Sequence, residues 1–139
     1  MIEIEEELKE QNLYKEVGII AGYKAQKEAL RRLYESQYSE RFHYIKDIDI
    51  NTVDAFQGRE MDIIFYSVVR SNSEGKLGFF QEVRRLNVAF SRARELLVVV
   101  GNHHSVTKNI RLNGEENPFV GIMTYIYDNE DDCLLKEVE

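Results

Sequence analysis

The feature that most constrains the fold is the stretch 84–102, RRLNVAFSRARELLVVVGN, in which a helical pattern runs directly into an aliphatic run. Its apolar residues recur at helical spacing and predict one buried helix face, formed by Leu86, Ala89, Phe90, Ala93 and Leu97. The aliphatic residues 96–100 that follow are typical of a central parallel strand covered on both faces. The stretch therefore predicts a helix that packs against a parallel sheet.

Four arginines lie in the same stretch, and helical geometry would separate them. Arg85 and Arg92 are seven residues apart, so on a continuous helix they share one stripe with Val88. Arg94 is turned from Arg92 by about 200° on such a helix. We therefore expect Arg92 and Arg94 to do different work, with Arg94 and Arg84 in structural roles.

The rest of the chain alternates strands with helices. We expect strands at 17–21, 45–53 and 62–69, and helices at 24–38 and from Asn117 onward. Ile4 and Leu8, four residues apart among glutamates, predict the exposed last turns of a helix whose earlier part is missing. The alternation predicts an α/β fold, a mostly parallel sheet with helices on both faces, whose ligands bind beyond the carboxyl ends of the strands.

The composition is that of an ordinary soluble domain. The chain has 139 residues, 43% of them hydrophobic and 31% charged, which fits a single domain. We find no apolar run of the roughly 18 residues needed to span a bilayer and no signal-peptide pattern, so we expect a cytoplasmic protein without a membrane partner. Cys133 is the single cysteine and has no partners at metal-ligand spacing, so no metal site is expected.

The net charge of −7 is unevenly distributed. Residues 1–11 carry −4 and the acidic tail, about 128–139, carries −5, which leaves +2 for the region between them. A mildly basic middle permits contact with phosphates without demonstrating it.

Three segments, in one order along the chain, resemble motifs IV, V and VI of superfamily 1 helicases. They are GIIAGYKAQ at 18–26, TVDAFQGREMDIIFYSVVRS at 52–71 and GFFQEVRRLNVAFSRARELLVVVGN at 78–102. The resemblance is to the branch that contains the nonsense-mediated-decay RNA helicase and the nuclease-helicases of replication. It implies that residues 1–139 form one second RecA-like domain, with the motifs inside 17–102 and a P-loop NTPase fold that lacks its own phosphate loop.

The resemblance implies catalytic roles for two arginines. Arg92 occupies the position of the family's arginine finger, which neutralises charge on a transferring phosphoryl group. Arg85 is expected to be its companion. The alternative is that Arg92 pairs with Glu95 on a solvated face and does no chemistry.

The QGRE segment implies the ATP-binding residues. The resemblance assigns Gly58 to close backbone approach to a phosphate and Glu60 to the ribose hydroxyls, with Arg59 and Gln57 beside them. Gln57 is also a candidate relay between nucleotide and nucleic acid. The alternatives are a Gly58 that serves a turn of positive φ and a Glu60 that serves a surface ion pair.

The nucleic-acid contacts are expected from Thr52, Tyr23, Arg70 and Ser71. Tyr23 and Gln26 match the family pattern, but Ala21 and Gly22 stand where the family has Thr-Pro, so the hydroxyl of that threonine is missing. The expected partner is single-stranded DNA or RNA, which phosphate and stacking contacts do not distinguish.

The sequence contains neither a GxxxxGK(S/T) phosphate loop nor an acidic pair after a strand to hold magnesium. We therefore expect ATP and Mg²⁺ to be bound by the full-length protein with a first RecA-like domain, and this chain alone to bind no cofactor tightly and to be inactive. The alternatives are a non-catalytic RecA-like module that holds nucleic acid or protein, and a nucleotide-binding switch domain of another α/β family.

Overall fold

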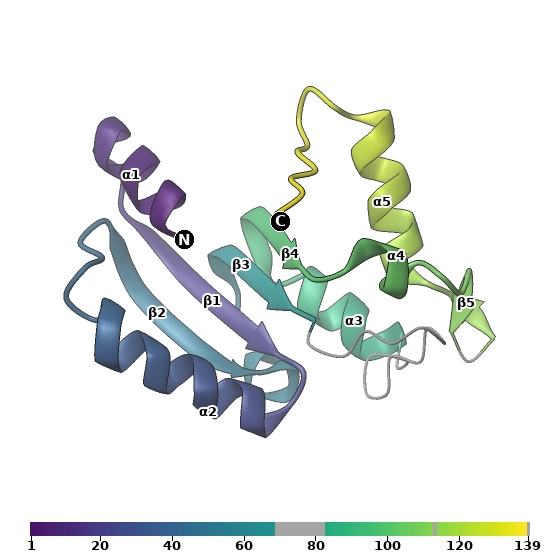
Figure 1. Ribbon diagram of the computed structural model, residues 1–139, viewed down its shortest axis with the longest axis horizontal. Helices are drawn as coiled ribbons and strands as arrows, with labels where there is room; N and C mark the ends of the chain where they lie inside the picture. Colours follow the sequence, from purple (N-terminus) through teal and green to yellow (C-terminus); the bar gives the residue numbers. More distant parts are fainter. Residues whose placement is uncertain (69–82, 113, 139) are drawn as a thin grey trace. The chain divides into compact units, whose positions relative to one another are not determined.

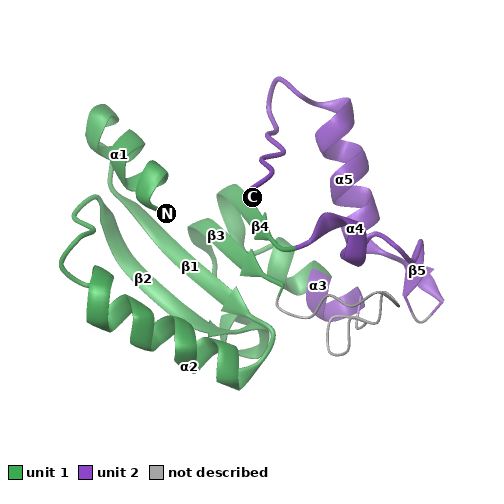
Figure 2. Cartoon of the chain, viewed as in Figure 1, with its two compact units in different colours: residues 1–69, 87–101 green, residues 70–86, 102–139 purple. Residues whose placement is uncertain are grey.

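The computed structural model describes residues 1–68, 83–112 and 114–138 (Figure 1). The chain divides into two compact units, residues 1–69 with 87–101 and residues 70–86 with 102–139 (Figure 2). The expectation that residues 1–139 form one domain stays a prediction.

The first unit contains a four-stranded, all-parallel sheet with strand order β2-β1-β3-β4 (Figure 1). The strands are β1 (Lys15–Ala21), β2 (Ile45–Thr52), β3 (Met61–Ser67) and β4 (Ala93–Val100). The prediction of an α/β fold with a parallel sheet is confirmed. The prediction of a central, covered strand at 96–100 is wrong, because in the described part of the chain β4 pairs with β3 alone and leaves Leu96 41% and Val100 53% exposed.

The helix before β4 is shorter than its apolar pattern predicts. The helix α3 (Val83–Phe90) ends at Phe90, Ser91 and Arg92 form a turn, and Ala93 begins β4. The strand begins there because the amide of Met61 donates to the carbonyl of Arg92 at 3.0 Å, which starts the pairing with β3. Arg85 and Arg92 therefore share no helical stripe.

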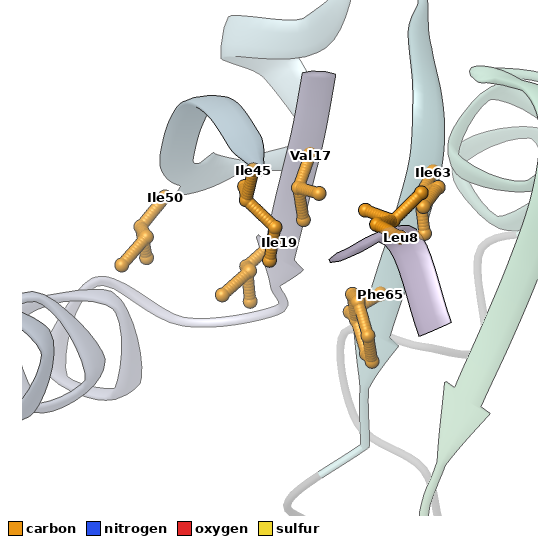
Figure 3. Close-up of a cluster of buried hydrophobic side chains, with 7 residues drawn as sticks. All are labelled: Leu8, Val17, Ile19, Ile45, Ile50, Ile63 and Phe65. Atoms are coloured by element: carbon orange, nitrogen blue, oxygen red, sulfur yellow. The ribbon is translucent and has the colours of Figure 1, made fainter. Parts of the chain in front are cut away.

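One face of the sheet is covered by α1 (Ile2–Gln11) and α2 (Lys24–Leu33), which a π-helical turn extends through Tyr34–Tyr38. Under them lies a cluster of buried side chains, Leu8, Val17, Ile19, Ile45, Ile50, Ile63 and Phe65 (Figure 3). Leu8 is only 7% exposed, which corrects the expectation for this residue, whereas most other residues of α1 are exposed as predicted.

The opposite face is covered by the 3₁₀ helix Val53–Phe56 and the last turn of α3. Tyr66 meets Phe90 edge to face, with ring centroids 5.2 Å apart. Phe56 lies over Gly18, because a methyl group on that glycine would be 2.8 Å from Phe56 Cε1 and 2.7 Å from Ile64 Cδ1. Helical segments thus cover both faces of the sheet, as predicted.

Glu5 of α1 holds the start of β2. Its carboxylate accepts the backbone N–H groups of His43, Tyr44 and Ile45 at 2.6 to 3.2 Å. A carboxylate that satisfies consecutive donors fixes both the helix and the strand entrance. Nothing in the sequence near Glu5 indicates this contact, because its partners are about 40 residues away.

Replacing Glu5 with glutamine is expected to lower the free energy of unfolding at pH 7 by about 1 kcal/mol, because a charged acceptor binds amides more strongly. Burial alone would raise the pKa of Glu5, but the amides of Tyr44, His43 and Ile45 outweigh it and hold the pKa below its ordinary 4.5. The carboxylate therefore stabilises the fold above about pH 4.5, and this contribution is lost as the pH falls through the folded-state pKa. Urea unfolding at neutral and acid pH should show the two proteins converging in acid. The neighbouring Glu6→Gln is the control, and an equal loss in it would contradict the assignment.

The second unit is organised around a buried asparagine. Its elements are α4 (His103–Val106), an antiparallel hairpin of β5 (Arg111–Leu112) and β6 (Glu115–Glu116), and α5 (Pro118–Asp128). Asn117 is 2% exposed; its Oδ1 accepts from the amide of Phe119, and its Nδ2 donates to the carbonyls of Val106 and Asn109 at 2.7 and 2.8 Å. The predicted start of this helix, Asn117 as cap with Pro118 in the first turn, is confirmed.

Within the described ranges no helix is long and apolar enough to cross a membrane. The cytoplasmic location stays a prediction.

Candidate functional site

The sheet separates the predicted site residues into two groups. Its register aligns Thr52, Ala21, Ser67 and Val100 at the carboxyl edge. Tyr23 and Thr52 belong to this edge. The turn formed by Gly58, Arg59 and Glu60, which we call the 58–60 turn, leads into the amino end of β3, and Arg92 leads into the amino end of β4. The predicted nucleotide residues thus lie at the amino edge, whereas the α/β pattern alone predicted ligands beyond the carboxyl ends of the strands.

The 58–60 turn has the backbone that its glycine permits. Gly58 has φ 77°, and a methyl group there would meet nothing within 4 Å. Gly58 therefore serves a turn of positive φ, as the alternative to a phosphate contact predicted. The same turn leaves the backbone open to a ligand. The side chain of Glu60 is 58% exposed, and its carboxylate lies 3.9 Å from Arg94 Nε, which is the surface ion pair of the alternative. Arg59 is ion-paired with Asp49 and lies over the ring of Phe56, 5.5 Å from its centroid.

Arg92 is held by neutral acceptors. Its Nε donates to the carbonyl of Val88 at 3.0 Å, and one terminal nitrogen donates to the hydroxyl of Ser91 at 3.0 Å. The other terminal nitrogen donates to the carbonyl of Arg59 at 3.3 Å. Among the described residues Arg92 has no acidic partner. The alternative pairing with Glu95 is absent, because Glu95 binds Lys15 at 2.6 Å.

Arg94 has the opposite environment. Its guanidinium pairs with Glu16 at 3.0 Å and with Asp62 at 2.9 Å, and it donates to the backbone carbonyl of Glu60 at 3.0 Å. The hydrogen bonds to Glu16 and then to Asp62 raise the pKa of Arg94. Burial alone would raise the pKa of Asp62, but the Glu16 amide and Arg94 hold that pKa below its ordinary value. Arg94 is a structural cation, as expected.

Gln26 lies at the carboxyl edge, and the sequence does not reveal its hydrogen-bond partner on β3. The Oε1 of Gln26 accepts the amide of Gly22 at 3.2 Å, and its Nε2 donates to the hydroxyl of Ser67 at 2.8 Å. Gln26 thereby ties the carboxyl ends of β1 and β3 together. In a doubly wound sheet this gap is where connections leave in opposite directions and ligands bind. Gln26 is three residues after the cap Tyr23, the position of the glutamine in a capping box, but it accepts from Gly22, and Ser67 is 41 residues away.

Four other predicted site residues lie in the part of the chain that the structure describes. Thr52 caps the 3₁₀ helix without a side-chain hydrogen bond, and Gln57 is exposed at its other end. Tyr23 is half-buried at the start of α2, and Arg85 is half-buried in α3. Arg70 and Ser71 lie outside the described residues.

Comparison with known proteins identifies relatives. A family model described as an AAA domain matches residues 1–104. The chain is 48% identical to Helicase sen1 of Schizosaccharomyces pombe over 86 residues, 62% of this chain and 5% of that protein. It is 43% identical to the Regulator of nonsense transcripts 1 homolog of Drosophila melanogaster over 93 residues, 67% of this chain and 8% of that protein. It is 38% identical to the ATP-dependent helicase NAM7 of Saccharomyces cerevisiae over 99 residues, 70% of this chain and 10% of that protein.

The chain spans between 5% and 10% of the length of these relatives. The matched region, 1–104, contains all four strands of the parallel sheet together with the 58–60 turn and Arg92. The chain therefore belongs to the AAA domain family of superfamily 1 helicases, as a second RecA-like domain of the branch that contains the nonsense-mediated-decay RNA helicase.

Proposed function

We propose that this chain is the C-terminal motor domain of an ATP-dependent helicase or translocase acting on DNA or RNA, and that Arg92 is its arginine finger. One observation carries the proposal. Arg92 is fixed by three neutral acceptors, whereas Arg59 and Arg94 at the same edge are each paired with a carboxylate.

This difference supports Arg92 as the arginine that acts on a phosphoryl group. Catalysis of phosphoryl transfer depends on positioning and on cancelling charge at the transferring group. A carboxylate partner would offset the charge of the guanidinium, while carbonyl and hydroxyl oxygens orient it and leave the charge in place. Arginine offers five N–H donors, and those not used by Val88, Arg59 and Ser91 are available to a phosphate.

The 58–60 turn supplies the remaining nucleotide contacts in this proposal. The open backbone at Gly58 admits close approach of a phosphate, and the exposed Glu60 carboxylate accepts hydrogen bonds from ribose hydroxyls. ATP and Mg²⁺ are held mainly by a first RecA-like domain, whose phosphate loop this sequence lacks. The chain by itself is then inactive.

The carboxyl edge is the nucleic-acid surface in this proposal. Thr52 offers a hydroxyl without a side-chain cap bond, and Tyr23 offers a ring at the entrance of α2. Contacts of these kinds are independent of base sequence. Closing and opening of the two RecA-like domains around ATP then moves the strand.

Variants at the two edges test the proposal by opposite effects in the full-length protein. Tyr23→Ala should weaken binding of a labelled single-stranded oligonucleotide by about 10-fold, the loss of one stacked base, and leave ATP turnover at saturating oligonucleotide unchanged. Arg92→Ala should lower ATP turnover and leave binding of the oligonucleotide unchanged. Fluorescence anisotropy and a phosphate-release assay measure the two effects, with Tyr125→Ala, an exposed tyrosine of α5, as the matched control. Equal loss of binding and turnover in both variants would sink the assignment.

A non-catalytic RecA-like module is the second candidate. Ala21 and Gly22 favour it, because they remove a hydroxyl from the carboxyl edge and the amide of Gly22 is taken by Gln26. A full-length protein that binds single strands but has no nucleic-acid-stimulated ATP turnover would establish this alternative.

A further inference from the structure

The segment that carries Arg92 and Arg94 forms hydrogen bonds with three consecutive residues at the start of β3. Arg92 donates to the carbonyl of Arg59 at 3.3 Å, and Arg94 donates to the carbonyl of Glu60 at 3.0 Å. The amide of Met61 donates back to the carbonyl of Arg92 at 3.0 Å. The acceptor that orients one terminal nitrogen of Arg92 thus belongs to a turn that Arg94 also holds.

The strand is distorted at the position of Arg94. Met61 pairs with Ala93 but Ile63 pairs with Leu96, so β4 has one residue more than β3 between these pairs. A bulge of this kind redirects side chains and is common beside active sites. Here Arg94 lies in the bulge and meets Glu16 of β1 and Asp62 of β3.

Arg94 therefore connects two strands, β1 and β3, to the 58–60 turn. The carboxylate of Asp62 also accepts the backbone amide of Glu16 at 2.9 Å, so this acidic partner is itself fixed. Arg94 Nε also lies 3.9 Å from the carboxylate of Glu60, an ion pair whose acidic side chain is 58% exposed.

We propose that Arg94 is a positioning residue for Arg92: through the carbonyl of Glu60 it holds the 58–60 turn against β1 and β3, and so fixes the guanidinium of the arginine finger. The inference rests on the proposed function of Arg92. The test therefore has one arm that needs no catalysis and one that does.

The first arm uses the purified chain and the Nε–Hε signal of Arg92 in a ¹H–¹⁵N spectrum. This proton is donated to Val88, so its exchange with solvent reports how firmly the guanidinium is held. Arg94→Gln should shift the signal and speed its exchange by about 10-fold, the effect of weakening one hydrogen bond. Lys15→Gln, which removes the ion pair with Glu95 at the same edge, should leave the signal unchanged.

A second variant guards against misfolding, because Arg94→Gln leaves carboxylates close together. Arg94→Gln with Asp62→Asn removes one of those charges, and the asparagine oxygen still accepts the amide of Glu16. Thermal melts identify folded samples. An Arg92 signal that is the same in the wild type and in folded samples of both Arg94 variants would overturn the inference.

The second arm is a double-mutant cycle on ATP turnover by the full-length protein. Arg94→Gln should lower kcat by about 10-fold with little change in the KM for ATP, because it misplaces a group that acts in the transition state. Arg92→Ala with Arg94→Gln should be no slower than Arg92→Ala alone. Multiplied losses would show a merely structural role and overturn the inference, whereas an Arg92→Ala protein with normal turnover would overturn the proposed function instead.

Discussion

Replacing Arg92 with alanine is expected to lower ATP turnover by the full-length helicase about 10³-fold, the lower end of the range for arginine fingers. The charge that Arg92 brings is not supplied by its neighbours, since Arg59 and Arg94 are each paired with a carboxylate. The KM for ATP should change much less than kcat, because the contact forms with charge that develops in the transition state. Steady-state phosphate release at saturating single-stranded oligonucleotide measures both constants.

Two further variants make the expectation specific. Arg92→Lys keeps the charge, but a lysine ammonium lacks the planar fork that reaches Val88, Ser91 and Arg59 together, so it should recover little of the lost turnover. Arg111→Ala removes an exposed arginine of β5 that donates to Gly114 and should leave turnover unchanged. Full activity of Arg92→Lys would show that a point charge suffices and that the observed geometry is irrelevant.

Replacing Gly18 with valine is expected to lower the free energy of unfolding by about 3 kcal/mol, at the upper end of overpacking effects. Its first added carbon alone would lie 2.7 Å from Ile64 Cδ1 and 2.8 Å from Phe56 Cε1, and both side chains are fully buried. The clash would move the 3₁₀ helix that contains Phe56 and, through it, the 58–60 turn. Urea unfolding followed by circular dichroism measures the loss.

A glycine with space around it provides the matched control. Gly121 lies in α5 with nothing within 4 Å of an added methyl group, so Gly121→Ala should raise the free energy of unfolding by up to about 1 kcal/mol. Gly18→Ala with Ile64→Val should be destabilised less than Gly18→Ala alone, since the change at Ile64 removes the methyl group nearest to the new carbon. Equal stability of Gly18→Val and the wild type would show that the sheet face under the 3₁₀ helix is not packed as described.

The architecture of the sheet was predictable because local residue patterns in the sequence indicate its strands. The aliphatic runs at 17–21 and 62–69 end in turns, and the alternation with helices left a parallel sheet as the consistent arrangement. Asn117 followed by Pro118 marked a helix start for the same reason, since a cap depends on adjacent residues. These signals are local in the sequence, and the structure confirms them as β1, β3 and the start of α5, with β3 ending at Ser67.

The end of α3 was not predictable in this way. Ala93 and Leu97 continue the helical spacing, but strand pairing with Met61, 32 residues earlier, takes the chain out of the helix after Phe90. The environments of the arginines depend on the same distant pairing. Arg94 meets Asp62 and Glu16, which are 32 and 78 residues away, so the helical spacing that separated it from Arg92 could not predict these partners.

The strand order β2-β1-β3-β4 also has a consequence for how the chain folds as it is synthesised. The strand made first, β1, occupies an inner position, and each later strand adds to an edge that already exists. β2 docks on one side of β1, β3 on the other side, and β4 on β3. Because chains emerge N-terminus first, this sheet grows without ever opening a formed strand pair to insert a new one. Arg92 and Arg94, which precede and begin the last strand, reach their partners only when that growth is complete.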